Sequence, residues 1–378
     1  MMLIVIAIQS IGFQILVPNL PVYALRFTSS ETLIGILAAS ISLSALVARP
    51  FTSVLADRGN VKRIIIVAQI AMAAGSVWLI FAPGIATLII IRLLQGIFFS
   101  VITTTTMTTG IRAVPLERMG YGVSLLTIVG IGSQAIAPAL GVYIADRMGY
   151  EVLFLFVGLL SAISGLVAIA LDPTPVAAPK DSAKKKIVLR DLFATEVIDL
   201  AVITLIFTSS TSIITNFVLL YGSEKGITGI GFYFTLYAAV LILLRIAGGS
   251  LIDRFPYQHI LAFCAVLSIT GLVFISQAQT FTHFAIAAIF MGIGYGYANP
   301  AAQTAMIKRV DPSRIGATTA MMYIGMDVAH TLGPMGMGML AENVGYEKGF
   351  LTYCIPVALS VILAYYGSRK KNQEGKLQ

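Results

Sequence analysis

Residues 150–171 read YEVLFLFVGLLSAISGLVAIAL, an apolar run whose one charged residue, Glu151, lies at its start. A helix needs about 20 mostly apolar residues to cross the hydrocarbon core of a bilayer, so this run predicts a membrane-spanning helix. Comparable runs follow one another along the chain, in which 57% of the residues are apolar, 11% are charged and the mean hydropathy is +0.90. These values exclude an ordinary soluble domain.

Along the whole chain, hydropathy predicts twelve helical spans joined by short connections. They cover residues 3–25, 32–55, 63–82, 85–110, 119–145, 150–171, 195–220, 228–252, 258–277, 280–305, 315–341 and 347–367. The first span continues through Pro18 and Pro21 with no small-residue cleavage site, which distinguishes it from a secretory signal. The sequence therefore predicts an all-α membrane protein with little chain left for a soluble domain.

The chain also contains an internal repeat. The tripeptide Gly149-Tyr150-Glu151 returns 196 residues later as Gly345-Tyr346-Glu347. The same offset pairs Arg49 with Arg245, Asp57 with Asp253, Gly96 with Gly292, Arg112 with Lys308, and Pro138 with Pro334. Two copies with six spans each share one orientation in the membrane, as in transporters built from parallel repeats, whose binding site lies between the halves.

A polar segment separates the two copies and sets the predicted domain boundaries. It carries Pro173, Pro175 and Pro179 together with the run Lys184-Lys185-Lys186, a composition typical of a solvated linker. We predict an N-terminal six-helix bundle at 1–171, a cytoplasmic linker at 172–194, a C-terminal six-helix bundle at 195–367 and a cytoplasmic tail at 368–378.

The distribution of Lys and Arg predicts orientation, because positive residues in short loops are retained on the cytoplasmic side. Of the 25 basic residues, eighteen fall in the linker, the tail and the other even-numbered connections, whereas the opposite connections hold Arg26, Arg147, Lys225 and Lys348. We therefore expect a multi-pass protein of the cell membrane with both termini in the cytoplasm. Topology also accounts for the net charge of +8, so no nucleic-acid partner is needed to explain it.

Two motifs carry a family resemblance. The connection after the second span reads Leu55-Ala56-Asp57-Arg58-Gly59-Asn60-Val61-Lys62-Arg63, and the fourth span contains Arg92-Leu93-Leu94-Gln95-Gly96. The first resembles the loop signature of the major facilitator superfamily, with Ser53 and Asn60 in place of its usual glycines. The second is similar to the arginine-and-glutamine motif associated with proton coupling in the antiporters of that family. The resemblance covers the chain from the first span to the last, and it implies twelve transmembrane helices in two pseudo-symmetric six-helix bundles.

A third motif bears on the direction of transport. The drug:proton antiporter branch of this superfamily has a glycine-rich stretch with Gly-Pro in its fifth span, where small residues let helices pack closely. This chain has Ala137-Pro138 and Gly141 there, and Gly333-Pro334 in its eleventh span. The resemblance favours proton-coupled efflux of a small amphipathic drug or metabolite. The altered fifth-span motif keeps a proton-linked importer of a sugar or other small solute as the alternative.

Three of the ionisable residues within the spans form a candidate titratable set at membrane depth, where a charge costs roughly 2.5 to 3.5 kcal/mol on insertion scales. Arg92 lies in the fourth span, and Asp327 and His330 lie three residues apart on one side of the eleventh. We expect Asp327 to take up a proton on one side of the membrane and release it on the other, with Arg92 or His330 tuning its proton affinity. The alternative is that Asp327 and His330 form hydrogen bonds between helices and have a structural role.

Charged residues near the cytoplasmic ends of the spans predict a conformational latch. Asp57, Arg58 and Arg112 would pair there and stabilise one of two rocking states, with Asp253 and Arg254 as a second copy. The alternative is that the same residues are topology signals and helix caps.

Uncharged polar residues gather in the first, fourth, seventh and tenth spans, which line the substrate path in the fold that the resemblance implies. We predict that this cavity is lined by Gln9, Gln14, Asn19, Gln95, Thr103, Thr208, Thr211, Tyr295, Asn299 and Gln303. Thr side chains also bond to their own helix backbone, so part of this set can serve packing instead. Such a cavity suits a mildly amphipathic or zwitterionic solute better than a strongly cationic one.

Other classes of function fit the sequence less well. The chain has no GxxxxGK[ST] phosphate loop, which disfavours nucleotide-driven transport, and its three scattered histidines disfavour a catalytic or metal site. We expect no enzyme activity, no metal and no cofactor. We expect a monomeric transporter driven by an ion gradient, with a small-molecule substrate and the lipid bilayer as its partners. A transport-inactive sensor or scaffold with the same fold is the remaining alternative.

Overall fold

The computed structural model describes residues 2–58, 60–112, 119–170, 195–247, 254–310 and 315–374. The chain divides into two compact units, Met1–Lys185 and Lys186–Gln378, which we call unit 1 and unit 2. The elements in the described ranges are helices. A helix satisfies its backbone hydrogen bonds internally, which is what an apolar segment requires in lipid.

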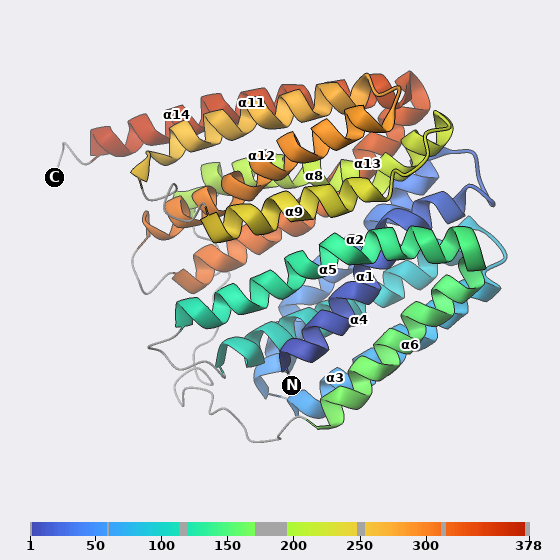
Figure 1. Cartoon of the computed structure of the whole chain (residues 1–378). Coiled ribbons are helices and arrows are strands. Elements are labelled where there is room, and N and C mark those ends of the chain that lie inside the picture. Colours follow the sequence, from blue (N-terminus) through green and yellow to red (C-terminus); the bar gives the residue numbers. More distant parts are fainter. Residues whose placement is uncertain are drawn as a thin grey trace. The chain divides into compact units, whose positions relative to one another are not determined.

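Unit 1 consists, in its described ranges, of six α-helices that run alongside one another (Figure 1). They are α1 Met2–Ala24, α2 Glu31–Arg58, α3 Val61–Trp78, α4 Ile85–Arg112, α5 Met119–Met148 and α6 Tyr150–Ile169, with a 3₁₀ turn at Leu79–Phe81 after α3. Helix α2 packs along α4, α1 along α5, and α3 along α6.

Unit 2 repeats this arrangement. Its described helices are α8 Ile198–Glu224, α9 Phe232–Ala247, α11 Tyr257–Ser276, α12 Phe281–Ile307, α13 Ile315–Thr352 and α14 Cys354–Glu374, and a 3₁₀ turn at Thr195–Val197 precedes α8. Helix α9 packs along α12, α8 along α13, and α11 along α14. These are the three pairs found in unit 1, taken in the same order along the chain.

The repeat is visible in backbone detail. Gly149 and Gly345 both have positive φ, 87° and 82°, a conformation that glycine adopts without steric cost. A Cβ atom on Gly96 would collide with the Ile41 carbonyl oxygen of α2. A Cβ atom on Gly292 would lie 3.2 Å from the carbonyl oxygen of Tyr237, the residue 196 positions after Ile41. The sequence offset therefore corresponds to equivalent helix contacts in the two units.

Nine segments of the described chain are long and apolar enough to cross a membrane by length and composition. The last of them, Met321–Gly367, includes parts of both α13 and α14. The apolar part of α9 that the structure describes, Phe232–Leu244, is shorter.

The expected connection between spans 315–341 and 347–367 corresponds to a kink at Gly345, whose non-helical backbone separates two helical parts within α13, Ile315–Thr352. A glycine at positive φ redirects the chain without a loop. In addition, α14 extends to Glu374, beyond the expected start of the tail at residue 368. The basic residues there suit the C-terminal end of a helix dipole.

Candidate functional site

Arg92 is a buried cation inside unit 1. Its side chain is 2% exposed, and its Nη1 donates a hydrogen bond to Gln95 Oε1 at 3.1 Å. Gln95 Nε2 in turn donates to Ser76 Oγ of α3 at 3.3 Å. In the described part of the chain Arg92 Nε has no partner and no carboxylate pairs with the guanidinium. A charge held this way in lipid usually has a functional reason.

The equivalent place in unit 2 is apolar. The offset of 196 residues takes Ser76 to Leu272, Arg92 to Ala288 and Gln95 to Met291. The helix contact at this place is equivalent in the two units, since Gly75 packs against the Gln95 side chain and Gly271 packs against the Met291 side chain. The fold therefore tolerates apolar side chains where unit 1 has the Arg92 network.

Asp327 and His330 lie on α13 in unit 2, and both are half-buried. His330 Nδ1 lies 2.8 Å from the carbonyl oxygen of Met326. A carbonyl oxygen only accepts, so Nδ1 is the donor in this hydrogen bond. Arg92 belongs to the other unit, so the grouping of these three residues stays a prediction.

The predicted cavity residues of unit 1 differ in their surroundings. Gln9 accepts a hydrogen bond from Gln69 Nε2 at 3.5 Å, and Gln69 also donates to Ser164 Oγ at 2.9 Å, which ties α1, α3 and α6 together. Asn19 is buried and donates to its own helix at Ile15 O, 2.7 Å away. These contacts lie within the bundle. Gln14 and Thr103 are half-buried.

In unit 2 the predicted cavity residues lie on α8 and α12. Thr208 and Thr211 are buried, whereas Tyr295, Asn299 and Gln303 are half-buried. Asn299 Nδ2 donates to the Tyr295 hydroxyl at 3.0 Å, so two polar side chains of α12 act together. Tyr237 of α9 also interacts with Tyr295 and Thr211. The sequence analysis did not include this tyrosine, because it reads as an ordinary residue of an apolar helix face.

The predicted packing motif lies at close helix contacts. A Cβ atom on Gly141 would lie 3.3 Å from the Ile15 carbonyl oxygen of α1, and one on Gly333 would lie 3.3 Å from the Ser209 carbonyl oxygen of α8. Each glycine has a proline nearby inside its helix, Pro138 in α5 and Pro334 in α13. The two motifs thus occupy the α1/α5 contact and its equivalent α8/α13 contact.

The predicted latch falls mostly outside the described residues. The side chains of Asp57, Arg58 and Arg112 are not among those described, and neither is Asp253. Arg254 is described and exposed. The latch stays a prediction.

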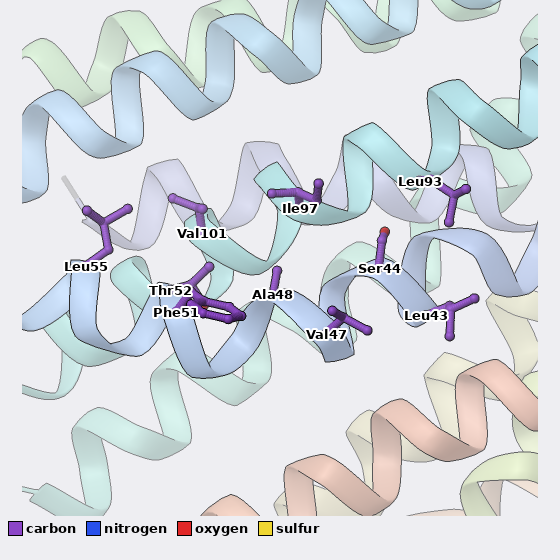
Figure 2. A pocket seen from close by; sticks show the side chains of 10 residues that line it. All are labelled: Leu43, Ser44, Val47, Ala48, Phe51, Thr52, Leu55, Leu93, Ile97 and Val101. Atoms are coloured by element: carbon purple, nitrogen blue, oxygen red, sulfur yellow. The ribbon is translucent and has the colours of Figure 1, made fainter. Parts of the chain in front are cut away.

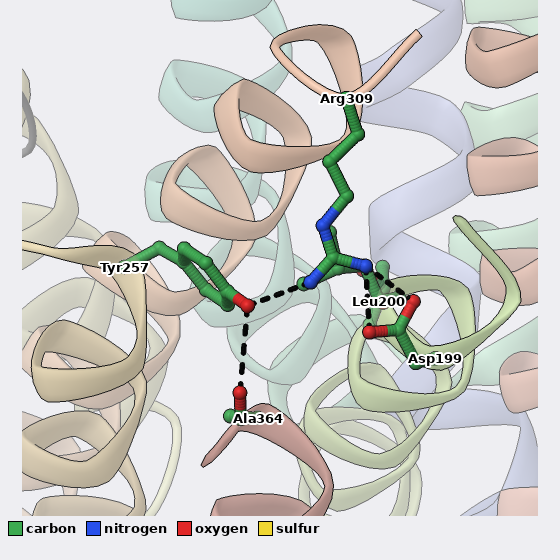
Figure 3. A network of polar contacts seen from close by, with 6 residues as sticks. Asp199, Leu200, Tyr257, Arg309 and Ala364 are labelled. Atoms are coloured by element: carbon green, nitrogen blue, oxygen red, sulfur yellow. Dashed lines mark hydrogen bonds and ion pairs between the residues drawn. The ribbon is translucent and has the colours of Figure 1, made fainter. Parts of the chain in front are cut away.

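A different charged cluster, which the sequence analysis did not assign, lies near one end of the unit 2 helices (Figure 3). Arg309 Nη1 donates to both carboxylate oxygens of Asp199, each at 2.7 Å, and Arg309 Nη2 donates to the Tyr257 hydroxyl at 2.6 Å. The Tyr257 hydroxyl donates onward to Ala364 O at 3.4 Å. These residues link α8, α11 and α14 to the turn after α12. The signal in the sequence was an acid, Asp199, at the start of an apolar run.

An apolar groove runs along the α2/α4 contact of unit 1 (Figure 2). It has a volume of about 580 Å³ and is lined by Leu43, Ser44, Val47, Ala48, Phe51, Thr52, Leu55, Leu93, Ile97 and Val101. Its two hydroxyl groups are already bonded, Ser44 to Ser40 O at 3.1 Å and Thr52 to Ser100 Oγ at 3.1 Å. The groove therefore offers contact to apolar groups and selects little by hydrogen bonding.

Comparison with known proteins decides the family. A sequence model of the Major Facilitator Superfamily matches residues 2–229 and again residues 200–378. The chain belongs to the Major Facilitator Superfamily. The double match agrees with the two units and their repeat.

Relatives of this superfamily member include multidrug transporters. It is 24% identical to the multidrug resistance protein MdtG of Proteus mirabilis, over 95% of this chain and 92% of that protein. It is also 24% identical to the multi-drug resistance efflux pump PmrA of Streptococcus pneumoniae, over 93% of this chain and 91% of that protein. Both names fit the drug:proton antiporter branch that the motifs resemble.

Solved structures of transporters share the fold. A mutant of the nucleoside transporter NupG matches with a TM-score of 0.79 at 15% identity, covering 97% of this chain and 98% of that one. A bacterial homologue of the human lysosomal transporter Spinster matches with a TM-score of 0.78 at 16% identity, covering 97% and 95%. This member of the Major Facilitator Superfamily is thus a multi-pass membrane transporter of a small molecule. The members of the family are transporters and not enzymes.

Proposed function

We propose that this transporter exports a small amphipathic drug or metabolite in exchange for protons. The two units alternate in presenting a binding site to the two faces of the membrane, and protonation of a membrane-embedded acid changes which state is preferred. No cofactor takes part, and the proton gradient supplies the free energy.

The observation that carries this proposal is the Arg92 network. It places a positive charge inside a membrane-spanning helix bundle at a cost, while the other repeat packs the same place with Ala288 and Met291. The fold does not require the Arg92 charge, and its hydrogen-bond partner at 3.1 Å is the flexible side-chain amide of Gln95. Arg92 can therefore exchange this partner for another when a proton or solute binds.

Asp327 is the acid that we assign to proton uptake. It is half-buried on α13, next to Thr331, whose hydroxyl bonds to the Asp327 backbone at 2.9 Å, and one turn before His330. A carboxyl group that is exposed alternately to the two sides of the membrane can take up a proton on one side and release it on the other. Alternating exposure of Asp327 would therefore move one proton per cycle.

Solute-driven proton movement in proteoliposomes tests the proposal. The purified protein is reconstituted with a pH-sensitive dye inside the vesicles, and a panel of amphipathic drugs and small metabolites is added in turn. Efflux coupling predicts that an outward solute gradient drives protons inward, and that an imposed pH gradient accumulates solute against its own gradient.

Two further outcomes are informative. If solute and protons move in the same direction, the protein is a proton-linked importer and the export direction is wrong. If folded protein moves protons with none of the solutes while solute exchange persists, coupling to protons is wrong.

A further inference from the structure

Unit 2 buries four hydroxyl groups that make no hydrogen bond in the described part of the chain. They are Thr208 Oγ1, Ser212 Oγ, Tyr237 Oη and Ser268 Oγ. Each of these residues is 1% exposed. Leaving a buried hydroxyl group unpaired is destabilising, and such groups are rare in native proteins. Four in one bundle indicate a partner that the chain itself does not provide.

Three of these groups, those of Thr208, Ser212 and Tyr237, belong to one cluster. Thr208 and Ser212 are four residues apart and share a face of α8, and Thr211 lies beside them on the same side. Tyr237 of α9 interacts with Thr211 and with Tyr295 of α12, although its hydroxyl group reaches neither in a regular hydrogen bond. Polar groups of three helices therefore converge inside unit 2.

Neighbouring side chains fix the orientation of this cluster. The ring of Tyr233 stacks on that of Tyr237, with centroids 6.2 Å apart and an interplanar angle of 10°. Asn299 holds the Tyr295 hydroxyl at 3.0 Å. The polar groups are thus positioned before any ligand binds, which lowers the entropic cost of binding.

The fold does not require these hydroxyl groups. In unit 1 the equivalent positions of Thr208, Ser212, Tyr237 and Tyr295 are Gly12, Leu16, Ile41 and Phe99. Phe99 stacks on Phe13 with centroids 4.3 Å apart, an apolar contact. Unit 2 alone therefore has a hydrogen-bonding interior where unit 1 has an apolar one.

We propose that Tyr237, with Thr208, Thr211, Ser212, Tyr295 and Asn299, forms a subsite in unit 2 for an uncharged hydrogen-bonding group of the transported solute. The group is a hydroxyl, a carbonyl or an amide, because none of the six side chains carries a charge. This assignment rests on the proposed transport function and names its substrate class. A site built to hydrogen-bond a solute discriminates strongly against analogues that lack the bonding group.

Equilibrium binding to the purified full-length protein, measured by dialysis, tests the subsite. The probes are chloramphenicol, an uncharged aromatic with hydroxyl and amide groups, and tetraphenylphosphonium, a hydrophobic cation with no hydrogen-bonding group. We expect Tyr237→Phe to weaken chloramphenicol binding about tenfold and to leave tetraphenylphosphonium binding unchanged. The matched control, Tyr233→Phe, removes a neighbouring hydroxyl group and should change neither.

The unfolding temperature without ligand separates this role from a structural one. Removing an unpaired hydroxyl group should leave that temperature unchanged or raise it, whereas removing a hydroxyl group that holds helices together, directly or through water, should lower it. The proposal requires the selective loss of chloramphenicol binding. Unchanged binding, an equal loss for both probes, or a wild-type protein that does not bind chloramphenicol overturns it. Selective loss of binding without any solute-driven proton flux would support the subsite and refute the proposed proton coupling.

Discussion

At the scale of single residues, the internal repeat provides its own control. Arg92 and Ala288 occupy equivalent places, and both units form the same helix contacts around them. A sequence under selection for stability alone would not retain a buried guanidinium where an apolar side chain packs equally well. Residues that differ in polarity between equivalent positions are therefore the best candidates for function.

The first prediction concerns this pair of positions. Replacing Arg92→Met and Gln95→Met together gives unit 1 an apolar contact like the one at Met291, with side chains that fill the space flexibly. We expect the unfolding temperature to stay the same or rise, because a buried charge is removed, and solute-driven proton flux to fall at least tenfold. Arg147→Gln removes an exposed arginine and serves as the control. Normal proton flux in the double variant would make the Arg92 network structural.

The second prediction concerns Asp327. Asp327→Asn keeps the size and hydrogen-bonding capacity of the side chain but removes its titration. We expect accumulation driven by a pH gradient to be lost while solute exchange at equal concentrations continues. Asp146→Asn, at an exposed position near the end of α5, is the matched control. Accumulation that persists in Asp327→Asn would exclude this carboxylate from coupling.

At the scale of helices, glycine determines how closely the elements pack. A Cβ atom on Gly96 would collide with the Ser44 hydroxyl group and the Ile41 backbone of α2, and backbone cannot move aside as a side chain can. The equivalent Gly292 is less crowded, since its nearest neighbours are Val240 side-chain atoms at 2.9 Å. The α2/α4 contact is therefore the tighter of the two.

The third prediction follows from this difference. Gly96→Ala should reduce the free energy of unfolding by about 1 to 3 kcal/mol, as overpacking usually does, and Gly292→Ala by less. Gly132→Ala in α5 has nothing within 4 Å of the new Cβ atom and should be neutral or slightly stabilising. Thermal unfolding in detergent measures all three. An effect of Gly132→Ala equal to that of Gly96→Ala would contradict the packing argument.

The fourth prediction concerns the charged cluster at the end of unit 2. Burial alone would lower the pKa of Arg309, but its hydrogen bonds to Asp199 and the charge of that carboxylate outweigh burial and raise the pKa. Because its pKa is raised, Arg309 stays charged throughout the working pH range. The stability that this charge contributes is fully present below the pKa that the group has in the unfolded chain. Asp199→Asn should lower the free energy of unfolding by about 1.5 to 3 kcal/mol, and Tyr257→Phe by about 1 kcal/mol. Equal stability of Asp199→Asn and wild type across pH 6 to about 8 would refute a stabilising role.

At the scale of the whole molecule, the sequence was sufficient for the architecture and insufficient for the polar interior. Apolar runs and the 196-residue offset predicted the helices and the repeat, because both depend on local composition. The partners of polar residues depend on which face of a helix meets which neighbour. Hydropathy does not specify this in a helix that is apolar all round, so the bonding of Gln9 to Gln69 and of Arg309 to Asp199 had to come from coordinates.

The orientation of the molecule supplies the last prediction. Eighteen basic residues on one side against four on the other predict that the linker and both termini are cytoplasmic. In a variant with Cys264 and Cys354 replaced by alanine, a cysteine at Thr228, in the connection between α8 and α9, should react with a membrane-impermeant maleimide in intact cells. A cysteine at Ser182 in the linker should react once the cells are opened. The reverse pattern would place the termini outside and would also invert the direction of transport inferred from any sided assay.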